Sequence, residues 1–169
     1  MGCDIHAVIE CRKYGSYWHF AEVSIARDYK LFAAIAFGDG GITDDLPYPP
    51  RGLPPDHSLR ASDLFFIEAD ELKKIEAEVD RDEEFLPEEE AKAWGDWAVE
   101  KYTKYKLLPG PDWHTPSWLR LGELEEALKC AGLHIEEQSP EFRAVVSSMQ
   151  VLSEAYGGEN VRLVFWFDG

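Results

Sequence analysis

The chain is poor in cysteine and in long apolar runs. It has 169 residues and 3 cysteines, and no two cysteines form a C-x-x-C pair. An odd number of scattered cysteines does not make a disulfide framework, so we expect a cytoplasmic protein with reduced thiols. No apolar run approaches the ~20 residues of a membrane helix. Asp4 and His6 also interrupt the first apolar stretch, so we expect neither a secretory signal nor a membrane partner.

Basic residues are scarce. The 17 Lys and Arg residues face 33 Asp and Glu residues, which gives a net charge of −16. This balance is the opposite of that in nucleic-acid-binding proteins, so we expect no nucleic-acid partner. The charge is concentrated in residues 68–90, which carry 12 acids and 3 bases. The rest of the chain is only mildly negative, so a local pocket for an anion is compatible with the composition.

Hydrophobic residues make up 45% of the chain, enough for a folded core. Apolar spacing, capping residues and turn residues predict each element. Strands are expected over 3–11, 17–25 and 161–167. Helices are expected over 27–37, 69–80, 88–105, 121–131 and about 139–156. The proline-rich stretches 39–63 and 107–118 are expected to be loops.

These elements predict an α+β fold. A small antiparallel sheet would contain the N-terminal hairpin and the C-terminal strand, and several helices would pack against it. We expect a single domain, 1–169, with an acidic helical insertion at about 66–106. If the last strand lies centrally and antiparallel to the first, Asp168 falls near Asp4 and Arg162 falls near Glu10.

Asp4 and His6 lie on one face of the first strand, two residues apart. Such pairs supply metal ligands in binuclear metal phosphoesterases. His57 and Asp168 would complete a divalent-metal site, although the other signature motifs of those enzymes are missing. The plainer interpretation is that Asp4 and His6 form hydrogen bonds with each other and with nearby backbone.

Two arginines are candidates for binding an anion. Arg27 opens the helix expected over 27–37, next to Tyr29, and Arg51 stands in the stiff segment PPRGLPPDHS. A guanidinium held by a rigid loop suits a phosphate or a carboxylate. The alternative for Arg51 is structural bracing of the turn, and the alternative for Arg27 is a surface residue beside a helix cap.

The segment DWHTPSWL contains His114, Ser117 and Trp118. Trp118 would stack on a base or belong to the core. Serine hydrolysis is disfavoured because the chain lacks a G-x-S-x-G elbow.

Several separated segments resemble a family of small proteins found mainly in bacteriophages and actinobacteria. The resemblance rests on MGCDIHAVIE, RDYKLF, RGLPPDHS, HTPSWL and RLVFWFD, and does not include the acidic middle of the chain. It implies no activity. It implies a phage-encoded protein acting in the cytoplasm of the bacterial host, with its polar residues gathered in a pocket.

Three functions remain open. In the first, the protein binds and sequesters a nucleotide-like, phosphorylated signal of host defence. The ligand-binding residues would be Glu10, Arg27, Tyr29, Arg51, His57, Ser117, Trp118 and Asp168. In the second, the pocket is a phosphodiesterase or hydrolase, with Asp4, His6 and His114 as its catalytic residues or with a bound metal. In the third, it is a phage interaction protein without a ligand site. A homo-oligomer is compatible with each of these functions.

Overall fold

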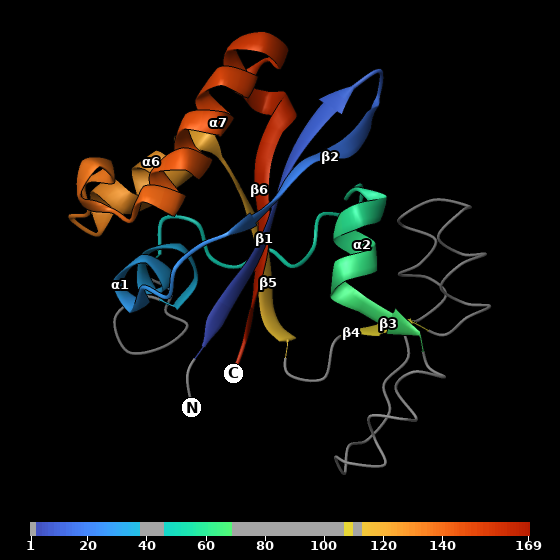
Figure 1. Ribbon diagram of the computed structural model, residues 1–169, viewed down its shortest axis with the longest axis horizontal. Coiled ribbons are helices and arrows are strands. Elements are labelled where there is room, and N and C mark those ends of the chain that lie inside the picture. Colours follow the sequence, from blue (N-terminus) through green and yellow to red (C-terminus); the bar gives the residue numbers. More distant parts are fainter. Residues whose placement is uncertain (1–2, 38–45, 69–106, 110–112) are drawn as a thin grey trace. The chain divides into compact units, whose positions relative to one another are not determined.

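The computed structural model describes residues 3–37, 46–68, 107–109 and 113–169 (Figure 1). The fold is α+β, as the sequence predicts. The chain divides into two compact units, which are described separately below. The first contains Met1–Ser58 and Asp112–Gly169, and the second contains Leu59–Pro111.

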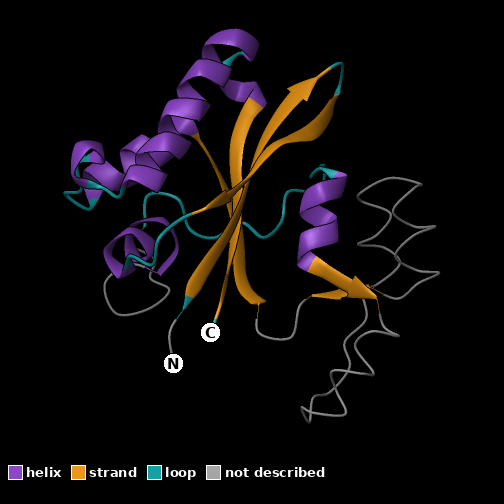
Figure 2. Cartoon of the chain, in the orientation of Figure 1, coloured by secondary structure: helices purple, strands orange, loops and turns teal. Residues whose placement is uncertain are grey.

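The first unit is built on a four-stranded antiparallel sheet (Figure 2). Its strands follow the order β2-β1-β6-β5. Their bounds are Asp4–Lys13 for β1, Ser16–Ser24 for β2, Trp113–Arg120 for β5 and Val161–Asp168 for β6. The C-terminal strand is therefore central, as expected.

The expected register between the first and last strands is confirmed. Asp4 lies opposite Asp168, and Glu10 lies opposite Arg162. Alternation is consistent with this register, because a slip by one residue would turn the apolar side chains away from the core.

One face of the sheet forms the hydrophobic core with the helices α1 (Tyr29–Phe32), α6 (Leu121–Cys130) and α7 (Pro140–Tyr156). The odd-numbered residues of β1 and β6 supply the sheet's share of this core. They include Ile5, Ala7, Ile9, Leu163, Phe165 and Phe167. Burying one large apolar side chain stabilises the fold by about 1.5–3 kcal/mol. The apolar side chains therefore determine which face of the sheet packs against the helices.

Local capping explains where two helices begin. The Asp28 side chain accepts hydrogen bonds from the backbone N–H groups of Lys30 and Leu31, and α1 then continues as a π-helical turn over Ala33–Phe37. Ser139 caps α7 in the same way, with proline at the first helical position. The expected N-terminal boundary of α7 is confirmed, whereas α1 begins two residues after the expected start at residue 27.

The prediction of a loop over 107–118 is wrong. Leu107–Pro109 forms β4, and β5 begins at Trp113. The proline-rich composition predicts a loop, because a proline such as Pro116 disrupts strand pairing. The structure accommodates it at an edge strand, where the pairing register shifts between His114 and Ser117 and Thr115 takes a φ of 52°.

The second unit contains α2 (Leu59–Phe65), β3 (Phe66–Glu68) and β4, and the two strands pair antiparallel. The prediction of a loop over 39–63 is wrong at its C-terminal end, because α2 begins at Leu59. The helices expected over 69–80 and 88–105, and nearly all of the acidic segment 68–90, lie outside the described residues.

The described part of the first unit also contains short 3₁₀ turns at Ile135–Glu137 and Gly158–Asn160. Within the described ranges, no helix is long and apolar enough to cross a membrane.

Candidate functional site

The candidate site lies on the sheet face opposite the helices. The even-numbered residues of β1 and β6 face this side, and segment 46–58 contributes side chains and backbone groups to it. Two polar clusters form here. The loop clamp is Glu10, Asp56, Ser58 and Arg162. The terminal cluster is Asp4, His6, Arg27 and Asp168, at the end of the sheet where the chain termini lie (Figure 1).

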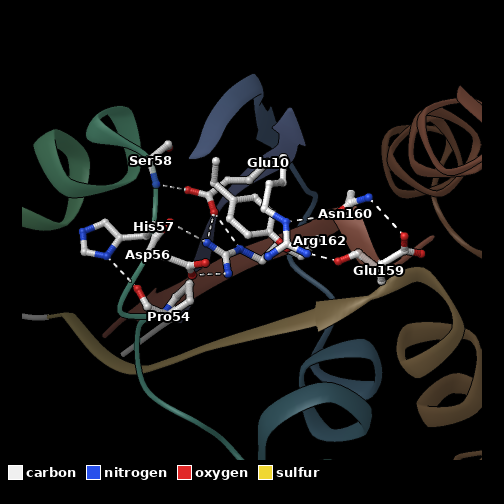
Figure 3. A network of polar contacts seen from close by, with 10 residues as sticks. Glu10, Pro54, Asp56, His57, Ser58, Glu159, Asn160 and Arg162 are labelled. Atoms are coloured by element: carbon white, nitrogen blue, oxygen red, sulfur yellow. Dashed lines mark hydrogen bonds and ion pairs between the residues drawn. The ribbon is translucent and has the colours of Figure 1, made fainter. Parts of the chain in front are cut away.

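Arg162 is the centre of the loop clamp (Figure 3). Its Nε donates to Glu10 Oε2 at 2.8 Å, its Nη1 donates to Asp56 Oδ1 at 2.7 Å, and its Nη2 donates to the Asp56 carbonyl at 3.0 Å. The second Glu10 oxygen accepts from the Ser58 backbone N–H at 2.6 Å. Both Glu10 and Arg162 are almost completely buried. The pair therefore fastens residues 56–58 to the sheet.

Aromatic rings flank this ion pair. The Arg162 guanidinium carbon lies 3.5 Å from the centre of the Tyr17 ring and 5.7 Å from the Trp118 ring. Cation–π contacts of this kind are stronger when water is excluded. The rings therefore stabilise a charge that Glu10 and Asp56 already neutralise.

His57 lies beside this cluster and is buried. Its Nδ1 lies 2.8 Å from the Pro54 carbonyl oxygen. Burial lowers the pKa of the imidazole, and the hydrogen bond to Pro54 partly opposes that effect. The His57 ring is therefore neutral at pH 7.

Arg51 is engaged within the chain as well. Its Nη1 and Nη2 bind the Glu123 carboxylate at 3.2 and 2.8 Å, and its backbone N–H donates to Ser117 Oγ at 3.2 Å. Its guanidinium carbon lies 4.6 Å from the centre of the Trp118 ring. These contacts match the bracing role that the sequence left open for Arg51, and they hold the proline-rich segment against β5 and α6.

The terminal cluster is built from similar pairs but is open to solvent. Arg27 donates from Nε to Asp4 Oδ1 at 2.8 Å and from Nη2 to Asp4 Oδ2 at 2.6 Å. Asp168 Oδ1 accepts from the Asp4 backbone N–H at 2.9 Å, and Asp168 Oδ2 lies 2.9 Å from His6 Nε2. The four side chains are between 33 and 55% exposed. A ligand can therefore reach a guanidinium, an imidazole and two carboxylates here.

The charges in this cluster are coupled. The hydrogen bonds from Arg27 lower the pKa of Asp4, and the hydrogen bond with His6 lowers the pKa of Asp168. Both carboxylates are consequently ionised at neutral pH. Asp4 in turn raises the pKa of the Arg27 guanidinium, with a smaller contribution from Tyr29.

Two indole rings lie next to His6. Its ring centre is 5.9 Å from that of Trp166, in a nearly parallel arrangement, and 5.4 Å from that of Trp113. Trp166 is buried, whereas Trp113 is partly exposed. Tyr29 is 58% exposed. The cluster therefore joins ionic groups to aromatic surface.

Two predicted groupings do not assemble. The His114 ring stacks on Phe167 and lies near Phe37, so it faces the core side, opposite His6. Its Nδ1 lies 2.9 Å from Thr115 Oγ1. The structure thus does not bring His114 into one catalytic cluster with Asp4 and His6.

The four predicted metal ligands are also divided. His57 belongs beside the loop clamp, and Asp4, His6 and Asp168 belong to the terminal cluster. Among the described residues, no group of three or more His, Cys, Asp or Glu side chains is arranged to hold a metal ion.

Sequence reasoning missed the tryptophans beside His6. The register gives the signal that was available, because His6 lies opposite Trp166, and Asp168 lies opposite Trp113. The sequence predicts a loop over 107–118, so it does not place Trp113 in this register.

Comparison with known proteins gives no relative: no family model, no curated protein and no solved structure matches this chain. The resemblance to the phage family therefore stays a prediction.

Proposed function

We propose that the terminal cluster binds a nucleotide-like ligand that carries phosphate, and that the protein acts by sequestering it. The observation that carries this proposal is the solvent-exposed, bidentate Arg27–Asp4 pair beside the His6–Asp168 pair. Phosphate and carboxylate present similar oxygen pairs to a guanidinium. A phosphate group would therefore take the place that the Asp4 carboxylate occupies.

The aromatic side chains supply the second half of the recognition. The partly exposed Trp113 and the exposed Tyr29 offer ring faces for a base. Asp168 would accept hydrogen bonds from ribose hydroxyls or base N–H groups. This combination of one cation, acceptors and rings favours a nucleotide over a simple inorganic anion.

The biological role follows the resemblance to phage proteins. A phage protein that holds a nucleotide signal would antagonise a defence system that depends on that signal. Such a protein would act in the cytoplasm of the bacterial host.

The test is a thermal-shift screen of the purified protein. The probes are AMP, ADP-ribose, cyclic dinucleotides, cyclic trinucleotides and inorganic phosphate, and each nucleotide is examined by chromatography after incubation. A ligand at about 100 times its Kd stabilises the fold by about 2.7 kcal/mol, which raises Tm by several degrees. Sequestration predicts such a shift with the nucleotide recovered intact.

Matched variants locate the binding. Arg27→Gln removes the proposed phosphate contact and should abolish the shift. Arg143→Gln makes the same change at an exposed position of α7 and should leave the shift unchanged. No shift with any probe would contradict the proposal and favour the phage interaction protein without a ligand site.

Hydrolysis of the same ligand is the second candidate. The 2.9 Å contact between His6 Nε2 and Asp168 Oδ2 favours it, because a carboxylate that orients a histidine is the usual arrangement of a general base. Degradation of a nucleotide by the wild type, but not by His6→Gln, would establish this activity. Intact nucleotide would exclude it for the probes used.

A further inference from the structure

The two edges of the sheet differ in how they are protected. β5 contains Pro116 and a shift in pairing register, and Ser117 accepts a hydrogen bond from Arg51. Such features hinder the addition of another strand. β2 has the sequence SYWHFAEVS, without proline, lysine or arginine, and Glu22 is its one acidic residue. Among the strands that the structure describes, β2 ends the sheet.

Aromatic side chains are exposed along this edge. Trp18 is 38% exposed and Phe20 is 47% exposed, with ring centres 6.3 Å apart. Trp18 also meets Tyr156 of α7 edge-on. A nine-residue edge strand with exposed rings is a template for pairing with another strand.

The pairing pattern of β2 limits which strand would fit. Trp18 and Val23 lie opposite Cys11 and Ala7, which face the core. His19 and Glu22 lie opposite Glu10 and Val8, on the other face. The register shifts at this point, so that Phe20 is an extra residue in β2. The two halves of the strand thus mirror each other about Phe20 and Ala21.

We propose that β2 pairs antiparallel with β2 of a second copy of this chain, with a two-fold axis between Phe20 and Ala21. Trp18 then lies opposite Val23 on the helix-bearing face. On the other face His19 lies opposite Glu22 of the second copy, twice by symmetry. In this register each residue lies opposite a residue of the same face, and the His19 imidazole lies opposite the Glu22 carboxylate. A shift by one residue would remove both features. The dimer is independent of the proposed ligand site.

Sedimentation velocity of the full-length protein tests the pairing from low to high micromolar concentration. Moderate salt is used because chains of net charge −16 repel each other. We expect a concentration-dependent dimer. Phe20→Lys should make the protein monomeric, because it buries two lysines at the two-fold axis. Val151→Lys, at a position of α7 that is 65% exposed, should leave the dimer intact.

His19 tests the register itself. His19→Glu sets two like-charged pairs across the interface and should weaken the dimer about tenfold. His19→Lys should tighten it by strengthening the contact with Glu22. Circular dichroism confirms that each variant is folded.

A wild-type protein that stays monomeric over the whole concentration range would overturn the proposal. The β2 edge would then be available to a strand of a different protein. A dimer with the same affinity in Phe20→Lys would place the interface elsewhere. A dimer that Phe20→Lys breaks but the two His19 variants do not move would refute the proposed register.

Discussion

The loop clamp and the terminal cluster are built from the same interactions in different surroundings. Each contains an arginine bound to a carboxylate, and each joins β1 to β6. The Arg162–Glu10 pair has exposed fractions of 4 and 0%, whereas Arg27 and Asp4 are 42 and 55% exposed. A buried pair that loses one partner leaves an uncompensated charge, but an exposed pair exchanges its partner with water or a ligand. Burial therefore separates a structural contact from a candidate site.

The largest effect is expected from Arg162→Met, which leaves the Glu10 carboxylate buried without its cation. We expect the free energy of unfolding to fall by about 3–5 kcal/mol in urea titrations. The double variant Glu10→Met/Arg162→Met removes both charges and should recover much of that loss. If the double variant is less stable than Arg162→Met, the buried Glu10 carboxylate is not destabilising without Arg162, and the prediction is wrong.

His57 should give the loop clamp a pH dependence. Because burial lowers its pKa, the unfolded chain binds a proton at a higher pH than the folded chain does. Stability should therefore fall as the pH drops below the usual histidine value of 6.5, by at most about 1.4 kcal/mol per pH unit. His57→Gln should flatten this part of the stability curve measured by urea unfolding. An unchanged slope would show that His57 has the same pKa in the folded and unfolded chains.

Asp168 should affect the free energy of unfolding at lower pH than His57 does. Its effect should also be smaller, since Asp168 is partly exposed. Its pKa is lowered in the folded chain, so its stabilising contribution is complete above the usual value of 3.8 and is lost as the pH falls through the lowered value. Asp168→Asn should reduce the loss of stability in that acid range. Urea unfolding at a series of pH values measures this effect.

Asp4→Asn should have the smallest effect on stability and a distinct effect on binding. The Asp4–Arg27 pair is exposed, so we expect Tm to stay close to that of the wild type. Freed from Asp4, Arg27 should bind a phosphate-bearing nucleotide more tightly in calorimetric titration. A weaker affinity would assign Asp4 to the ligand's hydroxyl or N–H groups instead.

The sequence predicts the sheet better than the site. The serine–proline pair places the start of α7, because that signal is local. Alternation predicts which residues of β1 and β6 share a face, but a slip by two residues keeps the same faces, so it allows the observed register without determining it. The proline-rich composition of 107–118 predicts a loop, since only the three-dimensional pairing shows how the edge strand β5 accommodates Pro116.

The roles of charged residues were harder to foresee because they depend on distant partners. Nothing near Arg51 in the sequence indicates that Glu123 neutralises it, and nothing near His6 indicates that His114 faces the other side of the sheet. Chemistry at a site is set by which side chains meet and how deeply they are buried, and local patterns do not contain that information.

The central claim is that the exposed Arg27 binds the ligand, whereas Arg51, which is held by Glu123, supports the fold. One experiment compares Arg27→Gln with Arg51→Gln, measuring Tm with and without whichever nucleotide stabilises the wild type. Arg27→Gln should keep the wild-type Tm and lose the ligand-induced shift. Arg51→Gln should lower Tm and keep the shift. The reverse pattern, in which only Arg51→Gln loses the shift, would contradict this account and place the ligand at the proline-rich segment.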